Sequence, residues 1–453
     1  MPAAAASTKS YSIHPKPARK GTGKFARRTV LEMPIVLVAA VVTAFALFAG
    51  PASGEWRANE IAASHALEIP RTALPAEPRH AADPRRLITI FEAGGWVSIL
   101  DGDSLQMRGR FQPTFLPEGA PQYSPDGRFL FLHSGDGWIG KYDLFSFKLV
   151  AQTRVGEKLR GIALSSDGKW LLAGNARPNT LAVLRARDLG LFKLIDVARA
   201  DGGVLRVDAV HDAGPRQSFI VGLKDSHEVW ELSYDPEAAP VYGNFVHSYR
   251  AGQVEGVIVE EQPFARRRLT MAEPLAGFFF DPAYAEVIAQ VPGGGAVYNL
   301  DARRRVTRLD LGGAPRFHGA VSWSMKDGQV MAVPDAAMAA IDIVDMDSWE
   351  TLRRIKTAGP IESIISHPGS PFIWAVVMPG SHAPGIHVID KQSMTIVRSI
   401  APATDGAKLQ AAFSRDGRHV LVAPLAKGEV LKIYDAPALR EVKRLPMAAP
   451  RLR

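Results

Sequence analysis

The stretch Y-S-P-D-G-R-F-L-F-L at residues 123–132 has two close copies, L-S-S-D-G-K-W-L-L-A at 164–173 and F-S-R-D-G-R-H-V-L-V at 413–422. Each copy places an Asp-Gly pair just before a run rich in apolar residues, and a further Asp-Gly pair stands at 327–328. Glycine accepts the positive φ that a tight turn between antiparallel strands requires. These pairs therefore predict turns between neighbouring strands of a sheet.

The turns belong to a longer repeated unit. Eight segments combine a glycine or polar turn with an alternating apolar strand and then an aspartate, at Asp101, Asp143, Asp188, Asp235, Asp301, Asp347, Asp390 and Asp435. The steps between these aspartates are 42, 45, 47, 66, 46, 43 and 45 residues. A short carboxylate accepts hydrogen bonds from nearby backbone N–H groups. We therefore predict that most of these aspartates cap the turn to the next strand.

A period of 40–50 residues with about four strands per unit is typical of a β-propeller blade. Because the helical period is nearly absent beyond residue 86, we predict an all-β fold, an eight-bladed β-propeller over residues 86–453. The one long step indicates an insertion between Tyr242 and Met271. We expect a solvated loop on one propeller face there, and the alternative is a loop that docks a partner.

The N-terminus has a different composition. Residues 1–32 are basic, and residues 33–54 carry no charge. We expect residues 33–54 to form a single hydrophobic helix that serves either as a signal peptide or as a transmembrane anchor. Arg27-Arg28 followed by Val30-Leu31 resembles a twin-arginine signal. We expect the body to be exported, either periplasmic or anchored in the inner membrane facing the periplasm. Residues 55–85, rich in Ala, Pro and Arg, indicate a tether.

Charge and cysteine content exclude several classes of function. The net charge of +8 comes mostly from residues 1–54, and the rest of the chain holds 47 basic and 45 acidic residues. This balance argues against nucleic-acid binding. The chain has no cysteine, which excludes disulfides, thiolate metal sites and the C-x-x-C-H attachment of a c-type heme. Serine-hydrolase, zinc-protease and P-loop motifs are also absent from the sequence.

Two of the twelve histidines stand out from the repeat. His318 in R-F-H-G and His367 in S-H-P-G are both assigned here to loops that enter a blade. Loops of that class line the mouth of the central channel, so the two imidazoles are expected to point into one cavity, where histidine can bind a metal or transfer protons. A structural role for each histidine is the open alternative.

The repeat also resembles a known family, the eight-bladed propellers that bind d1-type heme, over about residues 86–448. The strings that carry the resemblance are I-F-E-A-G-G-W-V-S-I-L, V-D-M-D-S-W-E-T-L-R-R-I and V-I-D-K-Q-S-M-T-I-V-R-S-I. Within the family the chain is most similar to the NirF group of heme d1 biosynthesis proteins. The resemblance implies a tetrapyrrole cofactor, heme d1 or its precursor, and no resident metal beyond the tetrapyrrole's iron.

Position by position, the resemblance implies five site residues. His367 and His318 match distal histidines with a catalytic role in proton transfer, and Arg160, Lys224 and Arg316 match cations that meet the carboxylates of the macrocycle. Family members also place an axial histidine upstream of the first S-x-D-G turn, where this chain reads P-E-G-A-P-Q-Y with Glu118 and Tyr123. Axial ligation of the iron from that side is therefore not expected.

The function implied is an exported heme d1 biosynthesis protein that holds a d1-type tetrapyrrole in the propeller mouth or aids maturation of its side chains. Such a protein would be a maturation oxidoreductase or a carrier, and without a c-type heme motif it is not a nitrite reductase by itself. Its partners would be other heme d1 biosynthesis proteins or nitrite reductase. The alternative from another class is a membrane-tethered, non-catalytic propeller that serves as a scaffold for protein partners.

Overall fold

The computed structural model describes residues 56–92, 94–199, 202–224, 226–248, 253–260, 262–378, 385–401, 409–424 and 430–446. The chain divides into one unit over residues 1–54 and a second over residues 55–453. The basic segment 1–32 and the apolar segment 33–54 lie outside the described residues, so the predicted signal or anchor helix is not described. Within the described ranges, no helix has the length and apolar character needed to cross a bilayer.

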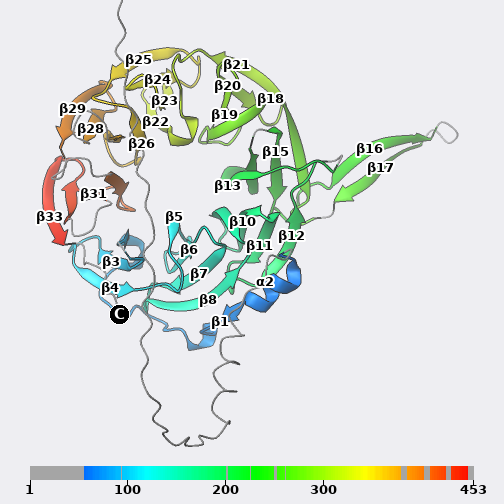
Figure 1. Ribbon diagram of the computed structural model, residues 1–453, viewed down its shortest axis with the longest axis horizontal. Helices are drawn as coiled ribbons and strands as arrows, with labels where there is room; N and C mark the ends of the chain where they lie inside the picture. Colours follow the sequence, from blue (N-terminus) through cyan, green and yellow to red (C-terminus); the bar gives the residue numbers. More distant parts are fainter. Residues whose placement is uncertain are drawn as a thin grey trace, which may run out of the picture. The chain divides into compact units, whose positions relative to one another are not determined.

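Antiparallel sheets make up almost all of the second unit (Figure 1). The first three sheets are β2-β3-β4 (Leu87–Phe91, Val97–Asp101, Met107–Phe111), β5-β6-β7-β8 (Glu118–Tyr123, Phe129–His133, Trp138–Asp143, Lys148–Arg154) and β9-β10-β11-β12 (Lys158–Leu164, Trp170–Arg177, Asn179–Arg185, Leu191–Asp196). The last three are β22-β23-β24-β25 (Val321–Met325, Gly328–Asp335, Ala340–Asp345, Thr351–Lys356), β26-β27-β28-β29 (Ile361–Ile365, Phe372–Val377, Ile386–Asp390, Thr395–Ile400) and β30-β31-β32-β33 (Leu409–Phe413, His419–Pro424, Val430–Asp435, Arg440–Pro446). The all-β prediction is confirmed.

Between these sheets lies a seven-stranded sheet in which one long strand serves two units. Its strands are β13 (Val207–Ala213), β14 (Ser218–Leu223), β15 (Ser226–Ser233), β18 (Arg266–Phe280), β19 (Glu286–Val291), β20 (Gly294–Asn299) and β21 (Arg304–Leu309). The first part of β18 pairs with β15, and residues 276–280 pair with β19. Gly277 takes φ +56° beside a register shift, and a β-bulge of this kind lets one strand change sheets.

Apolar clusters hold neighbouring sheets together, and six of them draw on two sheets that are consecutive in the chain. Another lies within the seven-stranded sheet and joins β13, β14 and β15 to β18, β19 and β20. One further cluster joins the first sheet to the last. In it Ile88, Ile90 and Leu100 pack against Leu421 and Ile433, all less than 9% exposed. Because each sheet buries both faces against neighbours and the last meets the first, the sheets form a closed ring, as Figure 1 shows.

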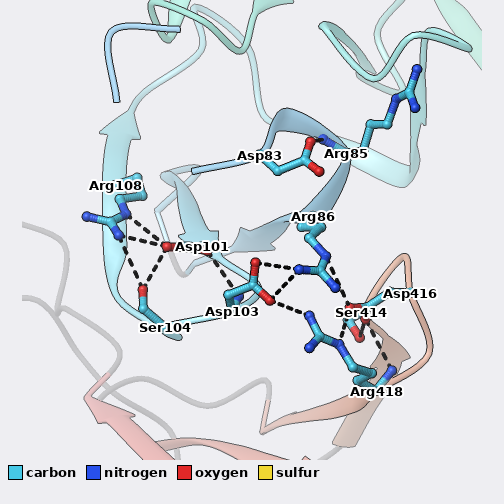
Figure 2. A network of polar contacts seen from close by, with 10 residues as sticks. All are labelled: Asp83, Arg85, Arg86, Asp101, Asp103, Ser104, Arg108, Ser414, Asp416 and Arg418. Carbon is cyan, nitrogen blue, oxygen red and sulfur yellow. Dashed lines mark hydrogen bonds and ion pairs between the residues drawn. The ribbon is translucent and has the colours of Figure 1, made fainter. Parts of the chain in front are cut away.

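A polar network lies beside this closing contact (Figure 2). The carboxylate of Asp103, after β3, accepts hydrogen bonds from Arg86, before β2, and from Arg418, before β31. Arg418 also donates to Asp416, whose carboxylate accepts from the hydroxyl of Ser414. Burial alone would raise the pKa of Asp416, but the hydrogen bonds from Ser414 and Arg418 outweigh it and lower the pKa to about 2. This network adds a charged link between the first and last sheets of the ring.

The Asp-Gly turns lie where the sequence predicts them, each between the first and second strands of its unit. Asp126-Gly127 joins β5 to β6, and Gly127 takes φ +80°. The Asp126 carboxylate accepts a hydrogen bond from the backbone N–H of Arg128 at 3.0 Å. The same bond recurs in the turns at Asp167 and Asp416.

The predicted capping of the turn between third and fourth strands is also confirmed at most positions. For example, Asp101 accepts from the N–H of Asp103 at 3.0 Å, and Asp435 accepts from the N–H of Ala438 at 2.8 Å. In two repeats a residue two places earlier caps instead, Asn299 in place of Asp301 and Asp345 in place of Asp347. The capping position is therefore fixed by the end of the strand rather than by the aspartate that marks the period.

Residues 56–86 are packed against the body, in contrast to the tether expected there. Helix α2 (Ala58–Ser64) buries Ile61 completely, and Trp56 is also buried. Strand β1 (Ala66–Leu67) pairs with β8 and adds a fifth strand to that sheet. The short 3-10 helices η2 (Arg71–Ala73) and η3 (Pro84–Arg86) complete the segment. Its contacts depend on tertiary partners, which local composition does not reveal.

The insertion between Tyr242 and Met271 is a hairpin rather than an irregular loop. Strands β16 (Val241–Ser248) and β17 (Gln253–Glu260) pair only with each other. Figure 1 shows the hairpin extending away from the sheets. The ring is thus interrupted by a two-stranded arm between β15 and β18.

Candidate functional site

The antiparallel order of the units gives the ring two distinct ends. We call the end where each first strand begins the leading end, and it also carries the turns between second and third strands. The opposite, trailing end carries the turns between first and second strands and between third and fourth strands. Contacts between sheets support this division, because Leu159 at the start of β9 donates its N–H to Gly135 in the turn after β6. At the trailing end Gly168 lies against Pro125, both in first-to-second turns.

All three predicted cations lie at the leading end. Arg160 is the third residue of β9, Lys224 stands in the turn after β14, and Arg316 precedes the 3-10 helix η5 (Phe317–Gly319). The N–H of Lys224 donates to the carbonyl of Arg206, the residue just before β13, which fixes that turn beside the start of a first strand. Arg160 and Lys224 are exposed, and Arg316 is half-buried.

These three side chains share an electrostatic feature. Within the described part of the chain, none of the three makes an ion pair or a side-chain hydrogen bond, whereas Arg86, Arg216 and Arg354 elsewhere in the ring are paired with carboxylates. Unpaired cations on one end of a ring favour an anionic ligand, because a carboxylate placed there gains charge-assisted hydrogen bonds without breaking existing ones.

His318 lies at the same end, in η5. Partial burial and the nearby guanidinium of Arg316 lower the pKa of its imidazole, while the negative charge of Asp208 on β13 opposes them. Its ring approaches Gly277, where a Cβ would lie 3.2 Å from Nδ1 of His318. The imidazole is therefore neutral near pH 7 and exposed at the leading end.

His211 on β13 is a second histidine in the field of Asp208. Its ring meets the edge of Phe280 at 5.2 Å, and burial lowers the pKa of its imidazole against the opposing charge of Asp208. From its place at a junction between units, the sequence indicates His211 as a weaker candidate than His318 and His367, and it does not single out Asp208. The same string could have indicated Asp208, because V-D-A-V-H-D places polar residues among apolar ones on the first strand of a unit.

His367 lies at the trailing end, away from His318. It follows β26 and stands in the turn to β27, the position that Asp-Gly pairs occupy in other units. Its Nδ1 accepts from the N–H of Gly369 at 3.0 Å, so the proton is on Nε2, which donates to the carbonyl of Arg415 at 3.2 Å. Both ring nitrogens are thus bonded to backbone. The expected convergence of His318 and His367 on one cavity is not what the structure shows.

The substitution in S-H-P-G has a structural explanation. The imidazole Nδ1 accepts from the N–H two residues ahead, as the carboxylates of Asp126 and Asp167 do in their turns. Its ring also fills the space over Gly417, where a Cβ would lie 2.0 Å from Nδ1. His367 therefore joins the turn of one unit to the turn of the next.

A pocket of about 760 Å³ opens at the leading end next to Arg316. It is lined by the middle of β18, the glycine-rich turn after β19 and the loop before η5, namely residues 274–276, 290–294, 310 and 312–315. The loop beyond His367 lines a different pocket, of about 730 Å³, together with Trp323 and Lys391. The loop segments that precede His318 and follow His367 thus line separate pockets.

Comparisons with known proteins agree with this architecture. The cytochrome D1 heme domain profile matches residues 82–451. A dihydro-heme d1 dehydrogenase of Pseudomonas aeruginosa is 36% identical over 412 residues, covering 90% of this chain and 79% of the relative. A NirF protein of Stutzerimonas stutzeri is 25% identical over 369 residues, covering 80% of this chain and 89% of the relative.

Solved structures give the same picture. The dihydro-heme d1 dehydrogenase NirN in complex with DHE superposes with a TM-score of 0.78 at 36% identity, covering 92% of this chain and 85% of that one. The C-terminal WD40 domain of Sif2, at 11% identity and a TM-score of 0.54, shares the fold alone. With the profile match extending over most of the ring, the chain belongs to the cytochrome D1 heme domain family.

Proposed function

We propose that this protein binds a d1-type tetrapyrrole, heme d1 or its dihydro precursor, at the leading end of the ring and acts in heme d1 biosynthesis. Family membership and the likeness to NirN in complex with DHE support the ligand class. The single observation that carries the location is the set of cations without partners in the described part of the chain, Arg160, Lys224 and Arg316.

Physical reasoning supports an acidic macrocycle for this end. A hydrogen bond from an arginine or lysine to a carboxylate contributes about 1.5–3 kcal/mol. Two or three such bonds would fix the edge of a flat ligand and orient it. His367 is left out of the proposed site, because both of its nitrogens are bonded to backbone at the trailing end.

We also propose that the ring has eight blades. Six of them are the separate sheets that contain β2, β5, β9, β22, β26 and β30. The other two share the seven-stranded sheet: β13, β14, β15 and the first part of β18 form one, and residue 276 of β18 through β21 forms the other. The first blade has three strands and shares its closing contacts with the last.

His318 is the proposed proton-transfer residue. The tetrapyrrole, when bound, supplies the conjugated system that gains or loses electrons. The neutral imidazole of His318 can accept a proton from a ligand held by Arg316, and its exposure lets it release that proton to water. The chain has no cysteine for a covalently attached heme, so electrons would pass to a separate acceptor protein.

The identities favour a protein of the dehydrogenase type over the NirF type expected from sequence, since 36% exceeds 25% at similar coverage of this chain. Export to the periplasm remains our proposal, supported by the basic segment and the apolar run before residue 55. The partners we propose are the other heme d1 biosynthesis proteins and nitrite reductase, as donors or recipients of the tetrapyrrole.

Titration of the full-length protein with dihydro-heme d1 and with heme d1, followed by visible absorption, tests the proposal. We expect saturable binding that Arg160→Ala weakens about tenfold or more. The matched control is Arg304→Ala, an exposed arginine at the trailing start of β21, which should leave the affinity unchanged. If the wild type does not bind either tetrapyrrole, the proposed function is refuted. If Arg160→Ala and Arg304→Ala lose affinity equally, the proposed location is refuted.

A further inference from the structure

A buried histidine at the leading end has no hydrogen-bond partner among the described residues. His133 ends strand β6 and is 7% exposed. Its Nδ1 is fully buried without a hydrogen bond, and within the described residues its Nε2 has no protein partner either. An unsatisfied buried polar group costs about 1–3 kcal/mol, so its presence needs a reason.

The neighbouring strand leaves one edge of this imidazole uncovered. Glu118 pairs with His133 across the sheet, and the next residue, Gly119, takes φ +67°. A Cβ at residue 119 would lie 2.8 Å from Cε1 and 3.1 Å from Nε2 of His133. Gly119 is exposed, so the missing side chain leaves Nε2 facing the open side of the first strand.

The position is close to the proposed site. The turn that follows His133 contains Gly135, whose carbonyl accepts from the N–H of Leu159 at 2.9 Å. Leu159 immediately precedes Arg160 in β9. His133 therefore stands at the same end of the ring as Arg160, on the neighbouring sheet.

Burial also selects the form of the imidazole. Burial lowers the pKa of His133 to about 4, so the ring is neutral near pH 7 and carries a single N–H. A proton on Nδ1 would be a buried donor without an acceptor, and orphaned N–H groups are rarer in proteins than acceptors that lack a partner. The proton is thus placed on Nε2, the nitrogen at the open edge.

We propose that the Nε2–H group of His133 donates a hydrogen bond to a peripheral oxygen of the bound tetrapyrrole, alongside Arg160. This assignment rests on the proposed function and extends it by naming a specificity residue from the second strand of a blade. Ligation of the iron by Nε2 is the competing role, and it would require the proton to move to the partnerless Nδ1.

The experiment compares His133→Leu and His133→Gln in the full-length protein, with iron-containing dihydro-heme d1 and its metal-free macrocycle as probes. Leucine removes the donor at similar volume, and glutamine retains an N–H donor. We expect His133→Leu to lower the affinity for both probes about tenfold, while the Tm of the protein stays equal or rises. We expect His133→Gln to recover most of that affinity. His419→Leu is the control, because His419 begins β31 beside the trailing-end turn and its Nδ1 is likewise buried without a partner.

Each result decides the matter. If wild type binds but His133→Leu binds both probes equally well, His133 does not contact the ligand. If only the iron probe weakens and its visible spectrum changes in both variants, His133 ligates iron and the donor role is wrong. If wild type binds neither probe, the proposed function itself fails. If His133→Leu lowers Tm, the test rests on His133→Gln alone. In that case, loss of affinity for both the iron-containing and the metal-free probe in the folded glutamine variant would overturn the proposal.

Discussion

Replacing His367 with alanine is expected to destabilise the ring without affecting ligand binding. The substitution removes the acceptor for the N–H of Gly369 and the donor to the carbonyl of Arg415. Each hydrogen bond contributes about 1 kcal/mol net, so the loss is about 2 kcal/mol. The substitution also removes the imidazole from its place over Gly417 and beside Phe413. His367→Asp restores the acceptor, as in the turns at 126 and 167, and should recover about half of the loss.

Thermal unfolding of the full-length protein measures the stability effect, and titration with dihydro-heme d1 measures binding. We expect Tm to fall by a few degrees for His367→Ala and by less for His367→Asp, with unchanged affinity in both. The reasoning would be refuted if His367→Ala kept the Tm of the wild type while the affinity fell tenfold. That result would mean that the imidazole faces the ligand rather than the neighbouring turn.

Three further outcomes concern stability. Asp103→Asn should lower Tm at low salt, because Asp103 links Arg86 to Arg418, and the difference should vanish in high salt since these groups are exposed. The pKa of Asp416 falls from 3.8 unfolded to about 2 folded, so its contribution is present above pH 4; the Tm difference between wild type and Asp416→Asn should shrink as pH falls toward 2. The pKa of His133 falls from 6.5 to about 4, so the unfolded chain binds the proton first. Wild type should therefore lose up to about 3 kcal/mol relative to His133→Leu between pH 6.5 and 4, measured by unfolding at each pH.

Local features of the repeat could be predicted from sequence because their causes are local. Asp126-Gly127 forms its turn through a side chain that bonds the backbone two residues ahead and a glycine with positive φ. Neither property needs a distant partner. Segment 56–86 is different, because Ile61 is buried only by sheets that come later in the chain. The sharing of β18 between two units also arises from tertiary pairing.

The structure places the predicted site residues at two different ends of the ring. Arg160, Lys224, Arg316 and His318 lie at one end of the ring, whereas His367 lies at the other. The repeat itself held the information to separate the histidines. S-H-P-G replaces an S-x-D-G turn, and such turns lie between first and second strands, so the same alignment that drew attention to His367 also assigns it to the trailing end.

Several polar groups at the two ends of the ring are satisfied differently. At the trailing end, His367 uses both nitrogens and Asp416 accepts bonds from Ser414 and Arg418. At the leading end, Arg160 has no partner in the described part of the chain and His133 buries an unsatisfied nitrogen. A turn repeated for stability gains from satisfying every group, whereas a ligand site must keep donors free until the ligand arrives. Nδ1 of His419 at the trailing end is also buried without a partner, so a single unsatisfied atom does not locate the ligand. The proposed location rests instead on Arg160, Lys224, Arg316 and His318, which all lie at the leading end.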